Sequence, residues 1–87
     1  MSSIAEAKEN IAAALEEAVG AKSALGGAKE AVGQAIDLFG AATAGSGHVR
    51  IQRVLGSYLA AIVDFEHAIK HLSDSQKDAN SYARSLG

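Results

Sequence analysis

Two histidines one helical turn apart are the residues of this chain best suited to chemistry. His67 and His71 lie four positions apart in the segment EHAIKH, with Asp64 and Asp74 each three positions from one of them. Residues at these spacings share one face of a helix, and imidazole and carboxylate groups are ligands that zinc prefers. A helical metal-binding protein is therefore one alternative. A solvated polar face explains the same residues, with Asp78 continuing it, and we expect no metal site.

The remaining polar residues give catalysis little basis. The order EHAIKH differs from the HExxH motif of zinc proteases. The chain contains no cysteine, and its serines lack the strand, turn and helix that form a nucleophile elbow. His48, Arg50 and Arg53 could hold an anion near a helix start, but capping and solvation of a turn are the better explanation for them. We predict a protein that is not an enzyme and that needs no cofactor.

The second half of the chain carries an unbroken heptad pattern, which predicts a long helix over about 48–84. Its apolar positions advance by alternating steps of four and three, as on one side of a coiled coil. The series is Ile51, Leu55, Tyr58, Ile62, Phe65, Ile69, Leu72, Gln76, Ala79, Ala83 and Leu86. Ser73 and Gln76 have the spacing of a capping box, which leaves a break near Ser73 open.

The first half carries a matching pattern and predicts a helix over about 3–42. One row recurs every seven residues as Ile4, Ile11, Ala18, Leu25, Val32 and Phe39. A second row, three positions later, consists of Ala7, Ala14, Ala21, Ala28 and Ala35. Together they suggest a seam with alanine layers between the helices. A third row is solvated and mostly acidic: Glu9, Glu16, Ser23, Glu30 and Asp37.

Capping signals place the ends of these helices. Ser3 and Glu6 form a capping box at the start of the first helix. Gly45 suits the left-handed conformation that ends a helix, and Ser46 is a candidate N-cap for the second. The turn is therefore expected at 43–47, and residues 1–87 form a single antiparallel two-helix coiled-coil hairpin of the all-α class. Folding the chain about Gly45 places Phe39 opposite Ile51.

Apolar residues outside the seam predict association. A two-helix hairpin of this size buries too little surface to be a stable monomer. We expect a homodimer that forms a four-helix bundle, or pairing with another helical protein. A line of glycines either lies on a solvated face that tolerates them or lets another helix approach closely. Together with several aliphatic residues it is the candidate interface: Gly26, Gly33, Gly40, Leu15, Val19, Val54, Leu59 and Val63.

Charge and hydropathy exclude several classes of protein. The net charge of −2 gives no strong field for nucleic acid. No uncharged apolar run approaches the roughly 20 residues that a membrane span requires. The first residues, MSSIAEAKENIAAAL, lack the basic start and apolar block of a cleavable signal peptide. We expect a cytoplasmic protein, or one secreted without such a signal.

In its architecture the chain resembles the small type VII secretion substrates with the WXG motif. The resemblance rests on two long helices, a glycine turn, an acidic balance and the lack of cysteine, and it covers the whole chain. The turn reads AGSGH where that family has Trp-X-Gly, and its export signal, a tyrosine with an acid four residues later, is absent after both Tyr58 and Tyr82. The resemblance implies a non-catalytic protein that binds through helix pairing, as a secretion substrate or as the partner of a larger secreted or toxin-associated protein. A structural accessory subunit of a larger assembly is the other alternative.

Overall fold

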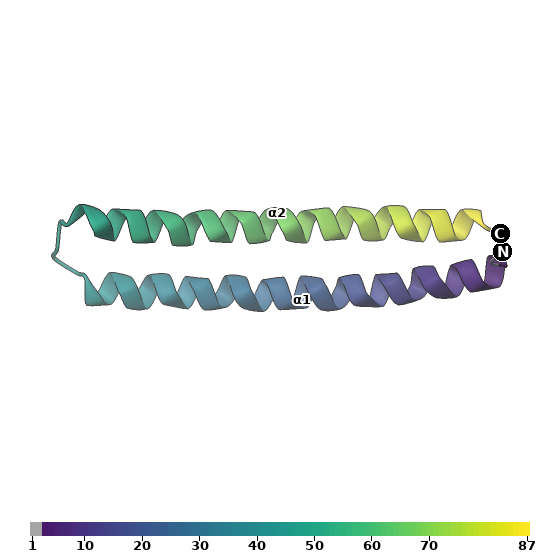
Figure 1. The fold of residues 1–87 in the computed structure, drawn as a ribbon, viewed down its shortest axis with the longest axis horizontal. Coiled ribbons are helices and arrows are strands. Elements are labelled where there is room, and N and C mark those ends of the chain that lie inside the picture. Colours follow the sequence, from purple (N-terminus) through teal and green to yellow (C-terminus); the bar gives the residue numbers. More distant parts are fainter. Residues whose placement is uncertain (1–2) are drawn as a thin grey trace.

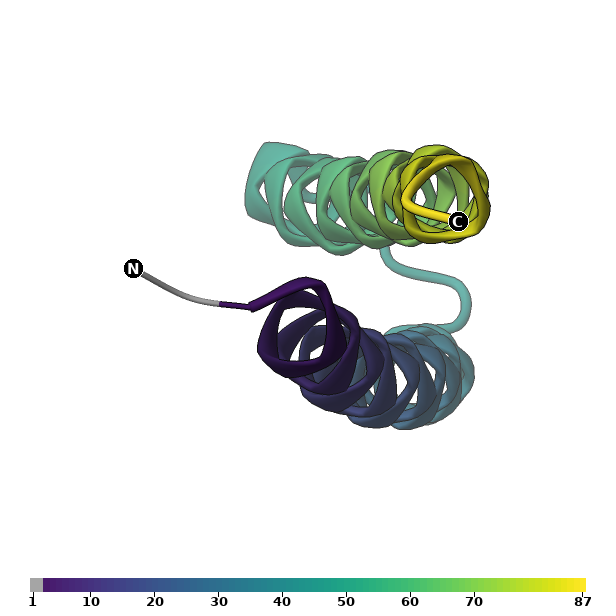
Figure 2. The same ribbon diagram turned by 90° about the vertical axis from the view of Figure 1, so that its right-hand side faces the viewer.

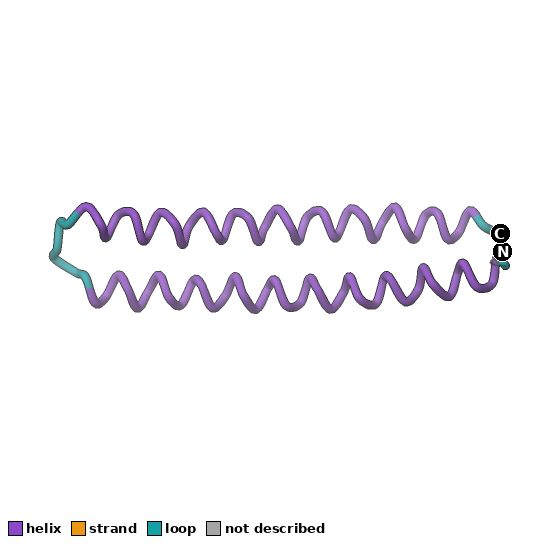
Figure 3. The backbone as a smooth tube through the Cα atoms, viewed as in Figure 1, coloured by secondary structure: helices purple, strands orange, loops and turns teal. Residues whose placement is uncertain are grey.

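The protein folds as an antiparallel hairpin of two long helices. The computed structural model describes residues 3–87, which form α1 (Ile4–Ala42) and α2 (Val49–Ser85). The helices lie side by side along their whole length, and the first and last described residues lie at the same end (Figures 1 and 3). The expected all-α class and the pairing of two long helices are confirmed. The helix bounds lie within one residue of the predicted ranges, and α2 continues through Ser73 without a break.

The first helix begins at the predicted cap. The Ser3 hydroxyl accepts a hydrogen bond of 3.1 Å from the Glu6 backbone N–H, which satisfies one of the donors that a helix start leaves unpaired. At the other end, the Thr43 hydroxyl donates to the Phe39 carbonyl over 2.7 Å. Thr43 thereby closes the last turn of α1 just before the chain reverses.

The turn confirms one expectation and corrects another. Gly45 has a φ of 82°, the left-handed conformation that favours glycine. Ser46, predicted as the N-cap of the second helix, instead donates its N–H to the Thr43 carbonyl over 3.0 Å. The N-cap of α2 is His48, whose Nδ1 accepts a hydrogen bond of 3.1 Å from the Arg50 N–H. The capping role considered for His48 is thus confirmed.

The heptad row predicted for α2 faces α1. All eleven members of the series from Ile51 to Leu86 are half-buried. Near the turn, the ring of Tyr58, a member of this series, meets the ring of Phe39 on α1 edge to face, with centroids 6.3 Å apart. Phe39 therefore contacts a residue one heptad beyond Ile51, because side chains lean toward the N-terminus of their own helix and so lean past each other in an antiparallel pair.

On α1, one predicted row is confirmed from Ile11 onward and the other lies at the margin of the seam. The row from Ile11 to Phe39 is half-buried, while Ile4 at its start is exposed. In the alanine row Ala7, Ala28 and Ala35 are half-buried, whereas Ala14 and Ala21 are exposed. The second seam row lies four positions after the first, and its half-buried members are Lys8, Leu15, Lys22, Lys29, Ile36 and Thr43. The alanine row lies beside the seam, because a residue three positions later turns to the opposite flank of the same stripe.

Three lysines thus occupy the seam of α1, and two of them reach across to α2. Lys22 Nζ donates to Gln76 Oε1 over 3.0 Å, and Lys29 Nζ lies 3.8 Å from Glu66 Oε1. Their aliphatic stems cover the apolar stripe while the ammonium groups stay near water. The Lys29 and Glu66 side chains are 43% and 53% exposed, so this ion pair contributes at most about 1 kcal/mol.

The hairpin has no buried interior. None of residues 3–87 is buried, whether apolar or polar. The molecule measures 63 × 18 × 14 Å, and the end-on view shows a single layer of two inclined helices (Figure 2). Neither helix of this described part combines the length and the apolarity needed to cross a membrane.

Candidate functional site

The candidate metal ligands lie on exposed positions of α2. His67, His71, Asp64 and Asp74 are all exposed. Between residues 3 and 87, no three His, Asp or Glu side chains come together in an arrangement that could hold a metal ion. The helix brings the two histidines to neighbouring turns, but no other element supplies a ligand from the opposite side.

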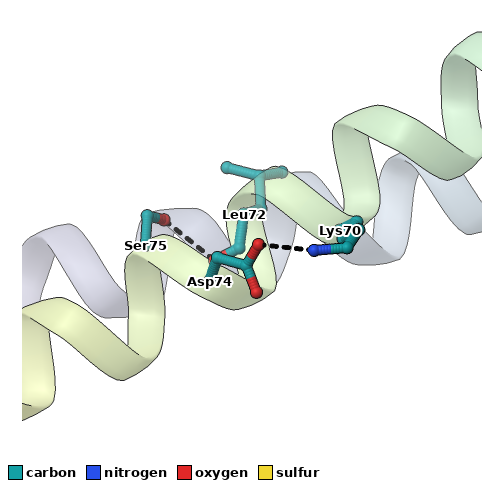
Figure 4. Close-up of polar contacts among 4 residues, drawn as sticks. All are labelled: Lys70, Leu72, Asp74 and Ser75. Atoms are coloured by element: carbon teal, nitrogen blue, oxygen red, sulfur yellow. Dashed lines mark hydrogen bonds and ion pairs between the residues drawn. The ribbon is translucent and has the colours of Figure 1, made fainter.

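Asp74 is already engaged by a cation. Lys70 Nζ donates to Asp74 Oδ2 over 2.9 Å, and nearby the Ser75 hydroxyl donates to the Leu72 carbonyl (Figure 4). The Lys70 hydrogen bond and charge hold the pKa of the Asp74 carboxyl below its usual value, with smaller effects from Lys77 and His71. A lowered pKa in the folded state means that this contact stabilises above the ordinary titration range of aspartate. The contribution disappears as the pH falls through the lowered pKa.

Zinc or nickel at modest excess should therefore leave the melting temperature unchanged. The two histidines alone offer too few ligands for a four-coordinate site, and Lys70 competes for Asp74. Thermal unfolding followed by circular dichroism, with and without metal, measures this. A rise in melting temperature that is lost in the double variant His67→Ala, His71→Ala would contradict the prediction.

The hairpin has two flat faces of different chemistry. In an antiparallel pair, corresponding flanks of the two seams meet on the same side. On one side, the row of Lys22 and Lys29 meets Gln76 and Glu66 of α2. We call this side the charged face. Its charged side chains keep it solvated.

The opposite side, the apolar face, carries no charged residue in the two rows that flank the seam. Both rows lie three positions after a seam row. They consist of Ala7, Ala14, Ala21, Ala28 and Ala35 on α1, and Val54, Ala61, Ala68, Ser75 and Tyr82 on α2. Val54, Ala61 and Ala68 are half-buried, whereas Tyr82 at the far end is 60% exposed. Ala7, Ala28 and Ala35 are half-buried as well, and Ala14, Ala21 and Ser75 are exposed. Packing within one hairpin therefore covers this face only in part.

The predicted interface residues fall on different sides of the hairpin. The row of Val19, Gly26, Gly33 and Gly40 is next to the seam lysines and so belongs to the charged face, as does Leu59 of α2. Leu15 lies in the seam, Val54 lies on the apolar face, and Val63 lies on the outer side of α2. Val19, Leu59 and Val63 are between 48% and 56% exposed. These residues do not form one continuous surface. The signal that marks the apolar face is the lack of charge in both flanking rows, and it is visible in the sequence only when the alanine row is assigned to a flank of the seam.

The glycine line has open space around it. A methyl group added at Gly26, Gly33 or Gly40 would meet no neighbouring side chain and no α2 backbone within 4 Å. Close approach of α2 therefore does not require these glycines. A groove for a second molecule on this line stays a prediction.

Gly33→Ala should raise the free energy of unfolding by about 0.5–1 kcal/mol, because alanine has the higher helix propensity and its methyl group meets open space. Urea unfolding followed by circular dichroism measures the change. The control is Gly45→Ala, which should destabilise the protein, because Gly45 has a positive φ. If Gly33→Gln stabilised the helix but weakened association, the glycine line would be a contact surface.

Nothing hollows the described surface into a binding site for a small molecule, and no pocket is found on it. Comparison with known proteins adds no family: no family model matches the chain, and no match was found among curated proteins or solved structures.

Proposed function

We propose that this protein is a non-catalytic helical interaction protein, which completes its hydrophobic core by packing against another pair of helices. The observation that carries the proposal is the lack of any buried side chain among residues 3–87. The seam residues, including the rings of Phe39 and Tyr58, are only half-buried. Covering such residues is favourable by roughly 25 cal/mol for each Å² of apolar surface removed from water.

Exposed large apolar side chains support the same proposal. Ile4, Leu38, Val49 and Tyr82 are between 58% and 73% exposed. Ile4 and Tyr82 lie at the open end of the hairpin, and Leu38 and Val49 lie near the turn. Covering them would remove apolar surface from water, which favours association. A second hairpin placed on one side would convert the single layer into a four-helix bundle, the arrangement in which helices of this kind bury their stripes.

A narrower form of the proposal follows from the resemblance to the WXG-motif substrates of type VII secretion. The hairpin of two long helices joined by a glycine turn supports it. In this form the partner is another helical hairpin or a larger secreted or toxin-associated protein. Because the turn lacks tryptophan and neither tyrosine has the acidic residue of the export signal, the proposal concerns helix pairing first and export second.

Sedimentation velocity over a range of concentrations tests the proposal. We expect association at micromolar concentration, either with itself or with an added helical partner, because the isolated hairpin leaves its seam half-exposed. A discrete dimer supports an interaction module, whereas growth to large particles supports the alternative of a structural subunit. A monodisperse monomer of 8.9 kDa that unfolds cooperatively at high temperature would contradict the proposal.

A further inference from the structure

We infer that the partner is a second copy of this chain, which packs on the apolar face with the two turns at opposite ends of the bundle. The inference rests on the proposed function and names its partner. The two rows that flank the seam on this side contain no charge over the whole length of the hairpin. On the other side, Lys22 and Lys29 would have to leave water for a second layer to form.

The largest seam side chains lie nearer to the apolar face. In each helix the seam has two rows, and the row on the charged side holds the lysines of α1. The row on the apolar side holds Phe39 on α1, and Tyr58 and Phe65 on α2. All three are half-buried in the single hairpin. A layer placed on the apolar face would cover them, whereas a layer on the charged face would leave them open.

The size of the face suits a stable dimer. With extents of 63 and 18 Å, one flat side of the hairpin covers about 1,100 Å², against the roughly 800 Å² per partner of a standard protein–protein interface. A face that packs on an identical face must also be complementary to itself under a two-fold axis. The rows of both helices meet this requirement.

A two-fold axis at the level of Ala68 places large side chains opposite each other at the ends of the α2 row and small side chains opposite each other at its centre. Antiparallel packing of α2 on its copy then sets Val54 against Tyr82 and Ala61 against Ser75, with the smallest side chains at the centre. Ala68 is level with the part of α1 between Ala21 and Ala28, since a short turn joins the two helices. On α1 the same axis sets the alanine row against itself, so that the two α1 backbones approach closely and evenly.

The edge of this interface pairs a carboxylate with an imidazole. Asp64 and His71 lie on α2 just outside the apolar row, on either side of the level of Ala68. The two-fold axis brings each Asp64 next to His71 of the other copy, twice in one dimer. On the facing edge of α1, the same axis sets Ala24 against Ala24, Ala31 against Glu17 and Leu38 against Asn10. No two like charges are placed opposite each other.

Single cysteine substitutions test which face of the hairpin packs in the dimer and how the two copies are oriented. The chain has no cysteine of its own that could interfere. Under mild oxidation Ala68→Cys should form a disulfide-linked dimer of about twice 8.9 kDa, because the two residues meet on the axis. Leu59→Cys, an exposed residue on the charged face, is the matched control and should stay uncoupled. Efficient coupling through Leu59→Cys alone, or a dimer that Ala68→Cys does not link, would overturn the inference.

A charge on the face gives a second readout without oxidation. Ala61→Glu should reduce the sedimenting mass from two chains to one at the same concentration, while Leu59→Glu on the other face should leave the dimer intact. Helix content by circular dichroism shows whether each variant still folds. A dimer of unchanged stability in Ala61→Glu would count against the apolar face.

The two proposals fail in different ways. If the unmodified chain is a poorly stable monomer that gains helix only with another helical protein, the second copy is the wrong partner and the interaction function stands. If the unmodified chain is a highly stable monomer that associates neither with itself nor with another helical protein, both proposals fail.

Discussion

Phe39→Ala should lower the free energy of unfolding by about 2 kcal/mol. Removal of a fully buried phenylalanine costs about 3–5 kcal/mol, and Phe39 is half-buried, so roughly half of that loss is expected. Its ring packs edge to face on Tyr58, with an interplanar angle of 79°. The pair joins the ends of the two helices next to the turn, so its loss should open that end first. Chemical unfolding followed by circular dichroism measures the change.

A double-mutant cycle separates the contact from the burial. Phe39→Ala and Tyr58→Ala, alone and together, should show a coupling of about 0.5–1.5 kcal/mol, as for other aromatic pairs. Tyr58→Phe is the control, since it keeps the ring and should change stability little. If Phe39→Ala proved no more damaging than a substitution in the solvated row, such as Glu30→Ala, the helices would not pack at the turn as described.

The sequence predicts the buried face of α2 well, because one pair of heptad rows holds most of its large apolar side chains. Ile62, Phe65 and Ile69 are large, and the steps between them alternate between three and four. The far side is mostly polar, although it also holds Val49 and Val63. Burial of large apolar side chains outweighs every other term in such a helix. The face turned toward α1 could therefore be read from residue types alone.

In α1 two different rows could form the second row of the seam, and residue types alone favour the row that lies at its margin. Beside the row that ends at Phe39, the second seam row can lie three positions later, where every residue is alanine, or four positions later, where Lys22 and Lys29 stand. The alanine row appears more apolar, yet an alanine gains little from burial. A lysine stem covers more apolar surface and its ammonium group finds a partner in Gln76 or Glu66. Only the position of α2 reveals these partners.

At the turn, a local preference is overruled by the point at which α2 begins. Serine is the better N-cap by preference, but α2 begins at Val49, and Ser46 belongs to the turn, where its N–H is bonded to the Thr43 carbonyl. His48 is the residue just before the helix, and its Nδ1 caps the helix by accepting from the Arg50 N–H.

The candidate metal ligands share one helix face, as their spacing predicts. Spacing within one helix says nothing about a ligand from another element, which a metal site would also need.

Ala21→Leu should leave the single hairpin intact and weaken its dimer by 10- to 100-fold. Ala21 is exposed in the hairpin, so a leucine there has room and disturbs neither helix. In the proposed dimer Ala21 faces Ala28 of the second copy, and two leucines would enter a close contact of backbones. Overpacking of this kind costs about 1–3 kcal/mol, and each 1.4 kcal/mol is a factor of ten in the dissociation constant.

The matched control is Ala13→Leu, which adds the same side chain to the outer side of α1, also at an exposed position. Sedimentation equilibrium gives the dissociation constants of both variants, and circular dichroism gives their helix content. If the alanine row were part of the seam within one hairpin, Ala21→Leu would lower the stability of the monomer itself, whatever the concentration. If the row faced only solvent, Ala21→Leu and Ala13→Leu would behave alike. A loss of association at unchanged helix content is the one result that places the alanines between two copies of the chain. Only at such a position does a leucine have room in the single hairpin and clash with the second copy in the dimer.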